Sequence, residues 1–360
     1  MIAATAPTQR HSRAKLLVLD SNGRISHAPR SALAHFLRMG DLVVANDAAT
    51  LPASLVGIHE RSGQAIEVRL AGCRALAADR AKEFTAIVFG AGDFRTRTED
   101  RPAPPELLQG DIFVIGPLRA IALRTLDHPR LVALRFEGSQ SSIWEGIARH
   151  GRPIQYAHVQ TPLALWDVWT PIAGSLLAFE PPSAGFVLDW TTLASIRESG
   201  AAFATITHAA GLSSTGDADL DHRLPFDEPY RISAATANAI NRTKRRSGRI
   251  VAIGTTVVRG LEQAASRDGI VHTGNGVATQ RIGATTRLRV VDAIVSGTHE
   301  PGTSHYELLR AFADDATLRR AAAELDVHGY RTHEFGDSVM IERRARCAAC
   351  VARSGLRLAA

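Results

Sequence analysis

The segment 249–262 restricts the fold of this chain more than any other. Residues 250–253 form an apolar run whose length suits a buried strand. The small turn Gly254-Thr255-Thr256 follows, and residues 257–265 can continue as a helix. A strand that runs through such a turn into a helix is typical of α/β folds. It gathers backbone N–H groups and hydroxyls at one point that suits a carboxylate, a phosphate or ribose oxygens. The same pattern also occurs in ordinary strand-to-helix connections that bind nothing.

The first 137 residues contain two kinds of pattern. Residues 15–56 read as a strand at Lys15–Asp20, a turn at 21–24 and a short amphipathic helix at Ser31–Met39. Residues 55–137 instead show short alternating runs between Gly, Pro and charged turns, which is typical of a small antiparallel barrel or sandwich. These runs are Ala65–Leu70, Phe84–Phe89, Ile112–Ile115 and Leu131–Phe136.

Helices and strands alternate again in the rest of the chain. The expected helices are Leu193–Ser199, Ser233–Arg245, Thr303–Ala313 and Leu318–Leu325, and the expected strands are Ala202–Thr207 and Ile250–Ile253. We therefore predict an α/β domain made of residues 1–55 and 138–345, interrupted by a β-barrel domain at 56–137. Residues 346–360 are expected to be a tail.

Five segments follow the motifs of one family in the same order. They are Gly40–Asp47 with Leu51-Pro52-Ala53, Pro182–Gly185, Arg249–Glu262, Val290–Thr303, and Gly329–Ile341. Through these segments, and over roughly residues 15–342, the chain resembles the S-adenosylmethionine:tRNA ribosyltransferase-isomerases of queuosine biosynthesis. The resemblance implies an α/β-barrel-like catalytic domain with an inserted small antiparallel β-barrel.

The resemblance also implies an activity. Members of this family transfer the ribosyl moiety of S-adenosylmethionine to 7-aminomethyl-7-deazaguanine in tRNA and isomerise it to give epoxyqueuosine, with release of adenine and methionine. S-adenosylmethionine is then a co-substrate, tRNA is the partner, and neither a metal nor a flavin is needed. Such a site should hold a base, a proton donor, and anchors for a carboxylate and a ribose.

Candidate site residues follow from the matched positions. The candidates for acid, base or ribose contact are His208, Glu228, His299 and Asp337. The candidates for substrate binding are Asn46, Asp47, Gly185, Gly254, Thr255, Thr256, Arg259, Glu262 and Thr303. Taken singly, most of them also suit a helix cap, a turn or an exposed position.

Arg259 and Glu262 are the most specific of these candidates. An arginine fork binds a carboxylate through two hydrogen bonds, so Arg259 suits an anionic group. Glu262, one turn later, could hold Arg259 in place or contact an ammonium or ribose group. The alternative is an i,i+3 ion pair on the helix surface.

The chain departs from the family pattern around the presumed site. Val187 stands where the family motif has histidine, and Ala49 and Ser54 stand where its early motif has arginines. The segment 223–228 keeps Glu228 but lacks the family's histidines. Since a valine carries no proton, these changes leave two alternatives to the family activity. One is a paralogue that uses S-adenosylmethionine with a small acceptor, and the other is a catalytically silent nucleoside- or RNA-binding protein.

Composition narrows the class of protein further. The 360 residues are 45% hydrophobic and carry a formal charge of +6, which suits an anionic partner such as RNA without requiring one.

Only three cysteines occur, so a disulfide framework is not expected. Cys347 and Cys350 have zinc-ligand spacing, but a structural zinc needs about four ligands. No apolar run reaches the ~20 residues of a membrane span. We expect a soluble, cytoplasmic protein.

Overall fold

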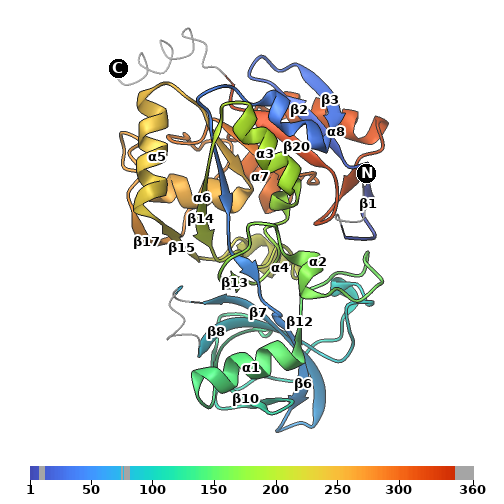
Figure 1. Ribbon diagram of the computed structural model, residues 1–360. Helices are drawn as coiled ribbons and strands as arrows, with labels where there is room; N and C mark the ends of the chain where they lie inside the picture. The colour runs from blue at the N-terminus through green and yellow to red at the C-terminus, as the bar shows by residue number, and fades with distance from the viewer. Residues whose placement is uncertain (8–12, 74–75, 77–81, 345–360) are drawn as a thin grey trace, which may run out of the picture.

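The molecule consists of an α/β part and a β-barrel part (Figure 1). The computed structural model describes residues 1–7, 13–73, 76 and 82–344. The predicted thiol pair Cys347 and Cys350 lies outside these residues. Among the described residues, no helix is both long and apolar enough to cross a membrane.

The α/β part is built on a nine-stranded mixed sheet. Its strand order is β17-β15-β14-β4-β16-β18-β20-β2-β3, and the four central strands from β14 to β18 run parallel. All residues of β4 and β16 are buried, and all except Asn46 are apolar. This is expected for central parallel strands that are covered on both faces of the sheet. The strands are β2 (Lys15–Leu19), β3 (Ile25–Pro29), β4 (Leu42–Asn46), β14 (Ala202–His208), β15 (Glu228–Ile232), β16 (Ile250–Ile253), β17 (Gly274–Ala278), β18 (Ala293–Gly297) and β20 (Ser338–Glu342).

Helices cover this sheet and begin at side-chain caps that the sequence supplies. Ser233, Thr303 and Asp314 each accept a hydrogen bond from a backbone N–H of the first turn that they precede. The helices are α3 (Trp190–Glu198), α5 (Ala234–Arg245), α6 (Thr255–Ala264), α7 (Ser304–Leu309) and α8 (Asp315–Val327).

Two predicted helices end three or four residues earlier than expected. The helix expected at Ser31–Met39 is a 3-10 helix, η2 (Arg30–Phe36), which ends with an N–H of Leu37 bonded to the carbonyl of Ala34. The helix expected at Thr303–Ala313 already ends at Leu309. In both cases apolar spacing alone did not reveal where the last helical hydrogen bond would form.

The second part is a closed antiparallel barrel. Its strands follow the order β6-β7-β8-β11-β10-β9, and β6 also pairs with β9, which closes the ring. Gly57 permits this closure, because a Cβ at this position would lie 2.4 Å from the carbonyl oxygen of Val114. The strands are β6 (Ser54–His59), β7 (Gln64–Cys73), β8 (Glu83–Phe89), β9 (Ile112–Ile115), β10 (Leu118–Thr125) and β11 (Leu131–Phe136). The predicted class, an α/β protein with an inserted antiparallel barrel, is confirmed.

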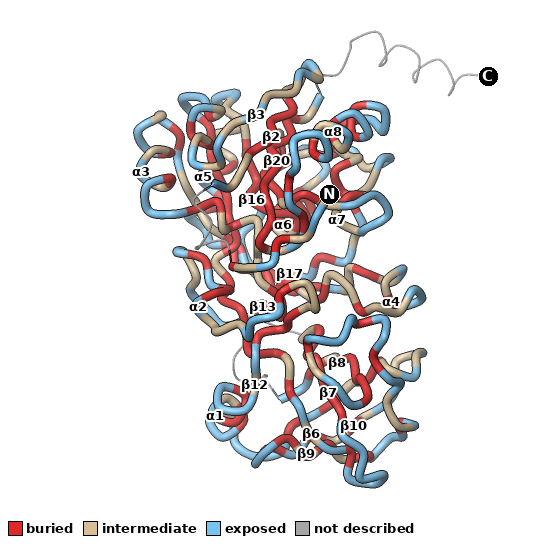
Figure 2. The backbone as a smooth tube through the Cα atoms, turned by 90° about the vertical axis from the view of Figure 1, so that its right-hand side faces the viewer, coloured by how far each residue is buried: buried red, intermediate tan, exposed pale blue. Residues whose placement is uncertain are grey.

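Two short strands lie where the chain passes between the two parts. β5 (Ala49–Thr50) leads from β4 toward the barrel, and β13 (Leu176–Ala178) pairs with it in parallel, so both strands run in the same direction. Each part has its own buried core (Figure 2). The remaining elements are β1 (Ile2–Ala3), η4 (Thr98–Asp100), α1 (Gln140–His150), β12 (Gly151–Arg152), α2 (Leu165–Val168), η5 (Ser183–Val187), α4 (Ala218–Arg223) and β19 (Arg331–Thr332).

Candidate functional site

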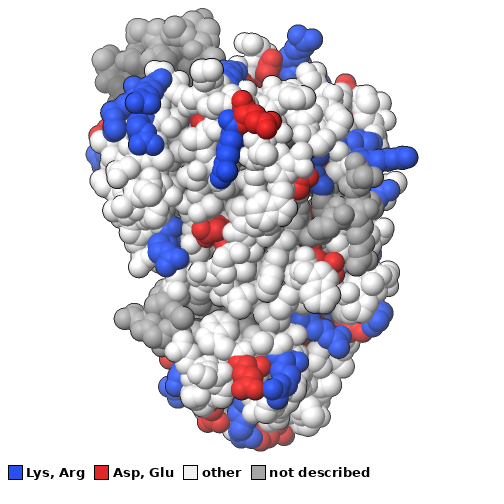
Figure 3. All heavy atoms as spheres, in the orientation of Figure 1, with Lys and Arg blue, Asp and Glu red and all other residues white. Residues whose placement is uncertain are grey.

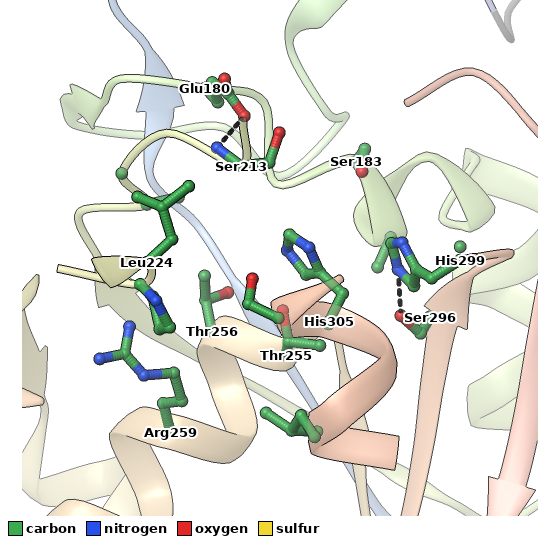
Figure 4. Close-up of a pocket in the computed structure, with 18 of the residues that line it drawn as sticks. Glu180, Ser183, Ser213, Leu224, Thr255, Thr256, Arg259, Ser296, His299 and His305 are labelled. Carbon is green, nitrogen blue, oxygen red and sulfur yellow. Dashed lines mark hydrogen bonds between the residues drawn. The ribbon is translucent and has the colours of Figure 1, made fainter. Parts of the chain in front are cut away.

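A cavity of about 290 Å³ lies at the carboxyl ends of β16 and β18. The starts of α6 and α7 form one wall, and the segments 180–184, 210–213 and 221–228 form the others (Figure 4). Crevices at the carboxyl ends of strands are the usual ligand sites of open α/β sheets. The segment that follows β13 thus contributes directly to this cavity.

The start of α6 presents uncapped backbone groups to the cavity. Gly254 precedes the helix with φ 98° and ψ 153°, a conformation that is essentially restricted to glycine, and no side chain caps its first turn. Thr255 and Thr256 follow and also line the cavity. The free N–H groups at the start of a ten-residue helix attract negative charge. This end of the cavity therefore suits a carboxylate or hydroxyl oxygens.

Arg259 lies one turn further along α6 and is fixed by the protein itself. Its guanidinium pairs with Glu228 and donates to the carbonyl oxygens of Ala278 at 2.9 Å and Phe226 at 3.1 Å. Glu228 also accepts a 2.6 Å bond from the N–H of Gly211, while burial raises the pKa of this carboxyl group. Because Arg259 is 4% exposed and bonded on several sides, its main role here is to hold Glu228 in the cavity wall.

Two stacked imidazoles, one of them from the start of α7, also line the cavity. The rings of His299 and His305 lie 4.6 Å apart at an interplanar angle of 12°, and Nε2 of His299 lies 3.0 Å from the Ser296 hydroxyl. Burial lowers the pKa of His305 to about 4 and that of His299 well below its ordinary value. Both rings are therefore neutral at pH 7. The ring of His305 projects from α7 among the labelled side chains of Figure 4.

Glu180 brings a second buried carboxyl group into the cavity. One of its oxygens accepts a hydrogen bond from the Tyr156 hydroxyl, and the other accepts a 3.0 Å bond from the N–H of Ser213. Burial is the main cause that raises its pKa to about 7. Glu180 can therefore gain or lose a proton near neutral pH.

Six of the thirteen predicted site residues line the cavity. They are Glu228, Gly254, Thr255, Thr256, Arg259 and His299. The other seven do not line it. They are Asn46, Asp47, Gly185, His208, Glu262, Thr303 and Asp337.

Three of these residues lie at the ends of β4 and β14. Asn46 bonds to both backbone groups of His208, at 2.9 Å each, and Asp47 accepts bonds from Thr205 and Thr207. His208 is fully buried, with Nε2 3.8 Å from Glu228 and its pKa lowered to about 3 by burial and by Arg259. These residues support the strand ends from which the cavity is built.

Glu262 and Asp337 bind backbone rather than facing the cavity. Glu262 accepts bonds from the N–H groups of Val290 at 2.9 Å and Val291 at 3.0 Å, so its carboxylate is occupied by backbone rather than by Arg259. Asp337 accepts bonds from the N–H groups of Lys15 at 2.6 Å and Arg331 at 2.8 Å.

Gly185 and Thr303 have local backbone roles. Gly185 lies in η5, where a Cβ would approach a methyl carbon of Thr170 to 2.8 Å. Thr303 caps α7, with its hydroxyl accepting a bond from the N–H of Tyr306. The capping role was already apparent from the position of Thr303 before a helix.

Sequence reasoning missed Glu180, Ser213 and His305. A buried-strand pattern at 176–178 followed by an acidic residue and two prolines was a usable signal for Glu180. His305 was placed inside a predicted helix, and only its orientation in space identifies it as part of the cavity. Ser213 had no signal, since its contribution is a backbone N–H.

Comparison with known proteins places the chain in a family. A family model described as "Queuosine biosynthesis protein" matches residues 1–341. The S-adenosylmethionine:tRNA ribosyltransferase-isomerase of Pelobacter propionicus is 33% identical over 345 residues, with 94% of each chain covered. The protein of the same name from Rhizobium rhizogenes is 30% identical over 363 residues, with 95% of this chain and 96% of the relative covered.

The fold has a counterpart among solved structures. The crystal structure of an S-adenosylmethionine tRNA ribosyltransferase from Thermotoga maritima matches with a TM-score of 0.50 at 23% identity, covering 94% of this chain and 96% of that one. At this identity the likeness concerns the fold. Together with the family match across nearly the whole chain, these findings confirm the resemblance. The chain belongs to the queuosine biosynthesis protein family.

Proposed function

We propose that this protein transfers and isomerises the ribosyl moiety of S-adenosylmethionine onto 7-aminomethyl-7-deazaguanine in tRNA, giving epoxyqueuosine with release of adenine and methionine. The observation that carries the proposal is the match to relatives with this activity in their name over 94–95% of the chain. The cavity supports it, because the best matched motifs supply the start of α6 and the imidazole of His299.

The cavity offers the groups that this chemistry requires. The N–H groups and hydroxyls at the start of α6 suit the carboxylate or ribose oxygens of S-adenosylmethionine. A base must remove a proton from C5′, which the neighbouring sulfonium makes acidic, and we assign this role to neutral His305. Glu180, when ionised, suits an ammonium group of methionine or of the aminomethyl acceptor. His299 then suits contact with the departing adenine. No step in this assignment uses a metal.

The partner and location belong to the same proposal. A formal charge of +6 favours association with a polyanion such as tRNA. On the face shown in Figure 3, Lys and Arg are scattered among Asp and Glu. tRNA binding would therefore depend on individual cations near the cavity, such as the exposed Arg281 in its lining. A cytoplasmic location follows if tRNA is the substrate.

A second candidate is a paralogue that uses S-adenosylmethionine with a small acceptor. At two of the three positions where the family motifs have a histidine that is lost here, this chain places an apolar side chain, and the third is Arg223. Val187 is buried in the core of the sheet, and Phe226 packs against the barrel core. Leu224 and Pro225, from the same altered segment, line the cavity directly. These changes make the surface that would bind the acceptor less polar than the family pattern implies, which favours a different acceptor.

One experiment separates the candidates. The purified protein is incubated with S-adenosylmethionine, with and without tRNA that carries the aminomethyl-deazaguanine base, and adenine and methionine are followed by chromatography. Release that requires the tRNA supports the proposed activity. Release without tRNA would favour the paralogue, and no release in either tube would leave a nucleoside- or RNA-binding protein.

A further inference from the structure

Two histidines and a glutamate come together outside the cavity lining. His158, His333 and Glu334 place one potential ligand atom each within 4.8 Å of one another. Nε2 of His158 lies 2.9 Å from a carboxylate oxygen of Glu334, and the His158 and His333 rings stack at 4.4 Å and 22°. These residues come from segments 175 positions apart or more, so only the tertiary fold creates the cluster.

The loop that carries His158 is locked by a buried side chain. The amide nitrogen of Gln155 donates to the carbonyl oxygens of Val159 at 2.6 Å and Thr161 at 2.8 Å, and its oxygen accepts a 3.0 Å bond from the N–H of Leu163. Gln155 is 5% exposed. The backbone around His158 is therefore held in one shape before any ligand arrives.

The turn that carries His333 and Glu334 is locked in a similar way. Asp337 binds the N–H of Arg331, the carbonyl of His333 accepts a bond from Gly336, and His333 has φ 68°. Gly336 is required here, since a Cβ would lie 2.4 Å from the carbonyl oxygen of Arg331. A non-glycine residue at positive φ costs free energy, and such residues cluster at functional sites.

A second cluster of the same composition is more exposed. In His27, Glu324 and His328 both histidines are exposed, whereas in His158, His333 and Glu334 only His333 is. The side chains of Glu324 and His328 are 40% and 45% exposed, against 18% for Glu334 and 16% for His158. The more exposed cluster serves as an internal control.

We propose that His158, His333 and Glu334 form a binding site for a zinc-like divalent transition metal. Two imidazole nitrogens and one carboxylate oxygen are a donor set that Zn²⁺ accepts, with water at the remaining position, whereas Mg²⁺ and Ca²⁺ prefer oxygen ligands alone. Binding requires small side-chain movements that draw the three ligand atoms together. The metal is not assigned a step in the ribosyl transfer, and its site stands independently of that proposed function.

The site is electrostatically connected to the cavity. The negative charge of Glu334 contributes to raising the pKa of both Glu180 and His305. A bound dication would reverse this contribution. Metal occupancy would then favour the ionised form of Glu180 and the neutral form of His305.

The test measures zinc binding directly in the full chain. Cys347 and Cys350 are first replaced by serine, because this pair could bind zinc on its own. After the protein is stripped with a chelator, Zn²⁺ affinity is measured by competition with a chromophoric chelator. We expect one ion per chain, with an affinity that falls at least about tenfold in His333→Ala and in Glu334→Gln, and is unchanged in His328→Ala.

Two further readouts identify the ligands. The spectrum of the Co²⁺-loaded protein should lack thiolate charge-transfer bands, and Zn²⁺ affinity should fall as the pH decreases because protons compete for the imidazoles. Circular dichroism of each variant checks its folding. The proposal is overturned if the serine double variant takes up no zinc, or if His328→Ala loses as much affinity as His333→Ala.

Discussion

Two buried carboxyl groups share the cavity but have different partners. Glu228 pairs with the buried guanidinium of Arg259, whereas Glu180 is bonded to a phenol and a backbone N–H. Burial favours the protonated form of both groups, and a neighbouring cation opposes this effect. Glu180 is therefore the group whose charge changes near neutral pH, with a pKa of about 7.

Stability should decrease with rising pH because of Glu180. Its pKa is raised from 4.5 to about 7, so the folded state retains a proton that the unfolded state loses between these values. The free energy of unfolding should fall across this window by up to about 3 kcal/mol relative to Glu180→Gln, which cannot titrate. Urea unfolding of both proteins at several pH values measures this difference. The same substitution at Glu145, which is 67% exposed, should leave the pH dependence unchanged.

His305→Gln should separate binding from chemistry. Glutamine is polar and uncharged but accepts no proton at working pH, so kcat should fall by about 10²–10⁴ while KM for S-adenosylmethionine changes little. Because the pKa of His305 is lowered to about 4, its imidazole stays neutral at higher pH. The wild-type rate should therefore lose the contribution of this base only as the pH falls toward that value. Steady-state adenine release gives both constants. The exposed His272, substituted in the same way, is the control, and an unchanged kcat in His305→Gln would exclude the proposed base.

At the scale of elements, local pattern predicted the framework of the site better than its side chains. β16 has the predicted limits Ile250–Ile253, whereas α6 begins at Thr255, two residues earlier than predicted and within the expected turn. Strand, turn and helix are set by neighbours in sequence, so this agreement is expected. Glu262 was misplaced because its partners, the N–H groups of residues 289–291, are far along the chain. For Glu180, the local pattern indicated an acidic residue after a strand, but its place in the cavity depends on contacts with segments far along the chain.

The glycine at the start of α6 should be needed for both stability and binding. Gly254→Ala forces alanine to φ 98°, which should cost about 1–3 kcal/mol. The new Cβ would also lie 3.4 Å from Ala184 in the facing cavity wall. Gly274→Ala introduces comparable strain at φ 125° with nothing within 4 Å. We expect both variants to lose stability, but only Gly254→Ala to lose affinity for S-adenosylmethionine by calorimetry. Equal affinities in the two variants would argue against a ligand at this helix start.

For the whole molecule, the ordered family motifs predicted the architecture, whereas the barrel closure needed the structure. The sequence showed four of the six barrel strands but not β6 or β10, whose alternation is interrupted by glycine or charged residues. The domain limits at 56–137 remain a prediction. Family motifs also could not reveal His305, because its importance depends on how α7 packs against α6.

Binding of tRNA should depend on cations at the cavity rather than at the opposite end of the sheet. Arg281 lines the cavity, whereas Arg267 belongs to a cleft near the start of β16 that is lined by several arginines, one lysine and three acidic residues. Both side chains are exposed. Arg281→Glu should weaken tRNA binding and reduce the slope of log K against log salt by about 1, if it contacts one phosphate. Arg267→Glu should have less effect in the same filter-binding titration. If Arg267→Glu weakens tRNA binding more than Arg281→Glu does, the tRNA binds at the opposite end of the sheet instead.

The pair β5–β13 lies directly beside the cavity. Only two residues separate the start of the Pro181-Pro182 segment from the end of β13, and Glu180 lies between them. Phe179, which precedes Glu180, and Leu212, which precedes its backbone partner Ser213, both belong to the hydrophobic core of the barrel. The packing of the barrel core therefore helps to fix the position of this carboxyl group, and a change in that core should be felt in the cavity.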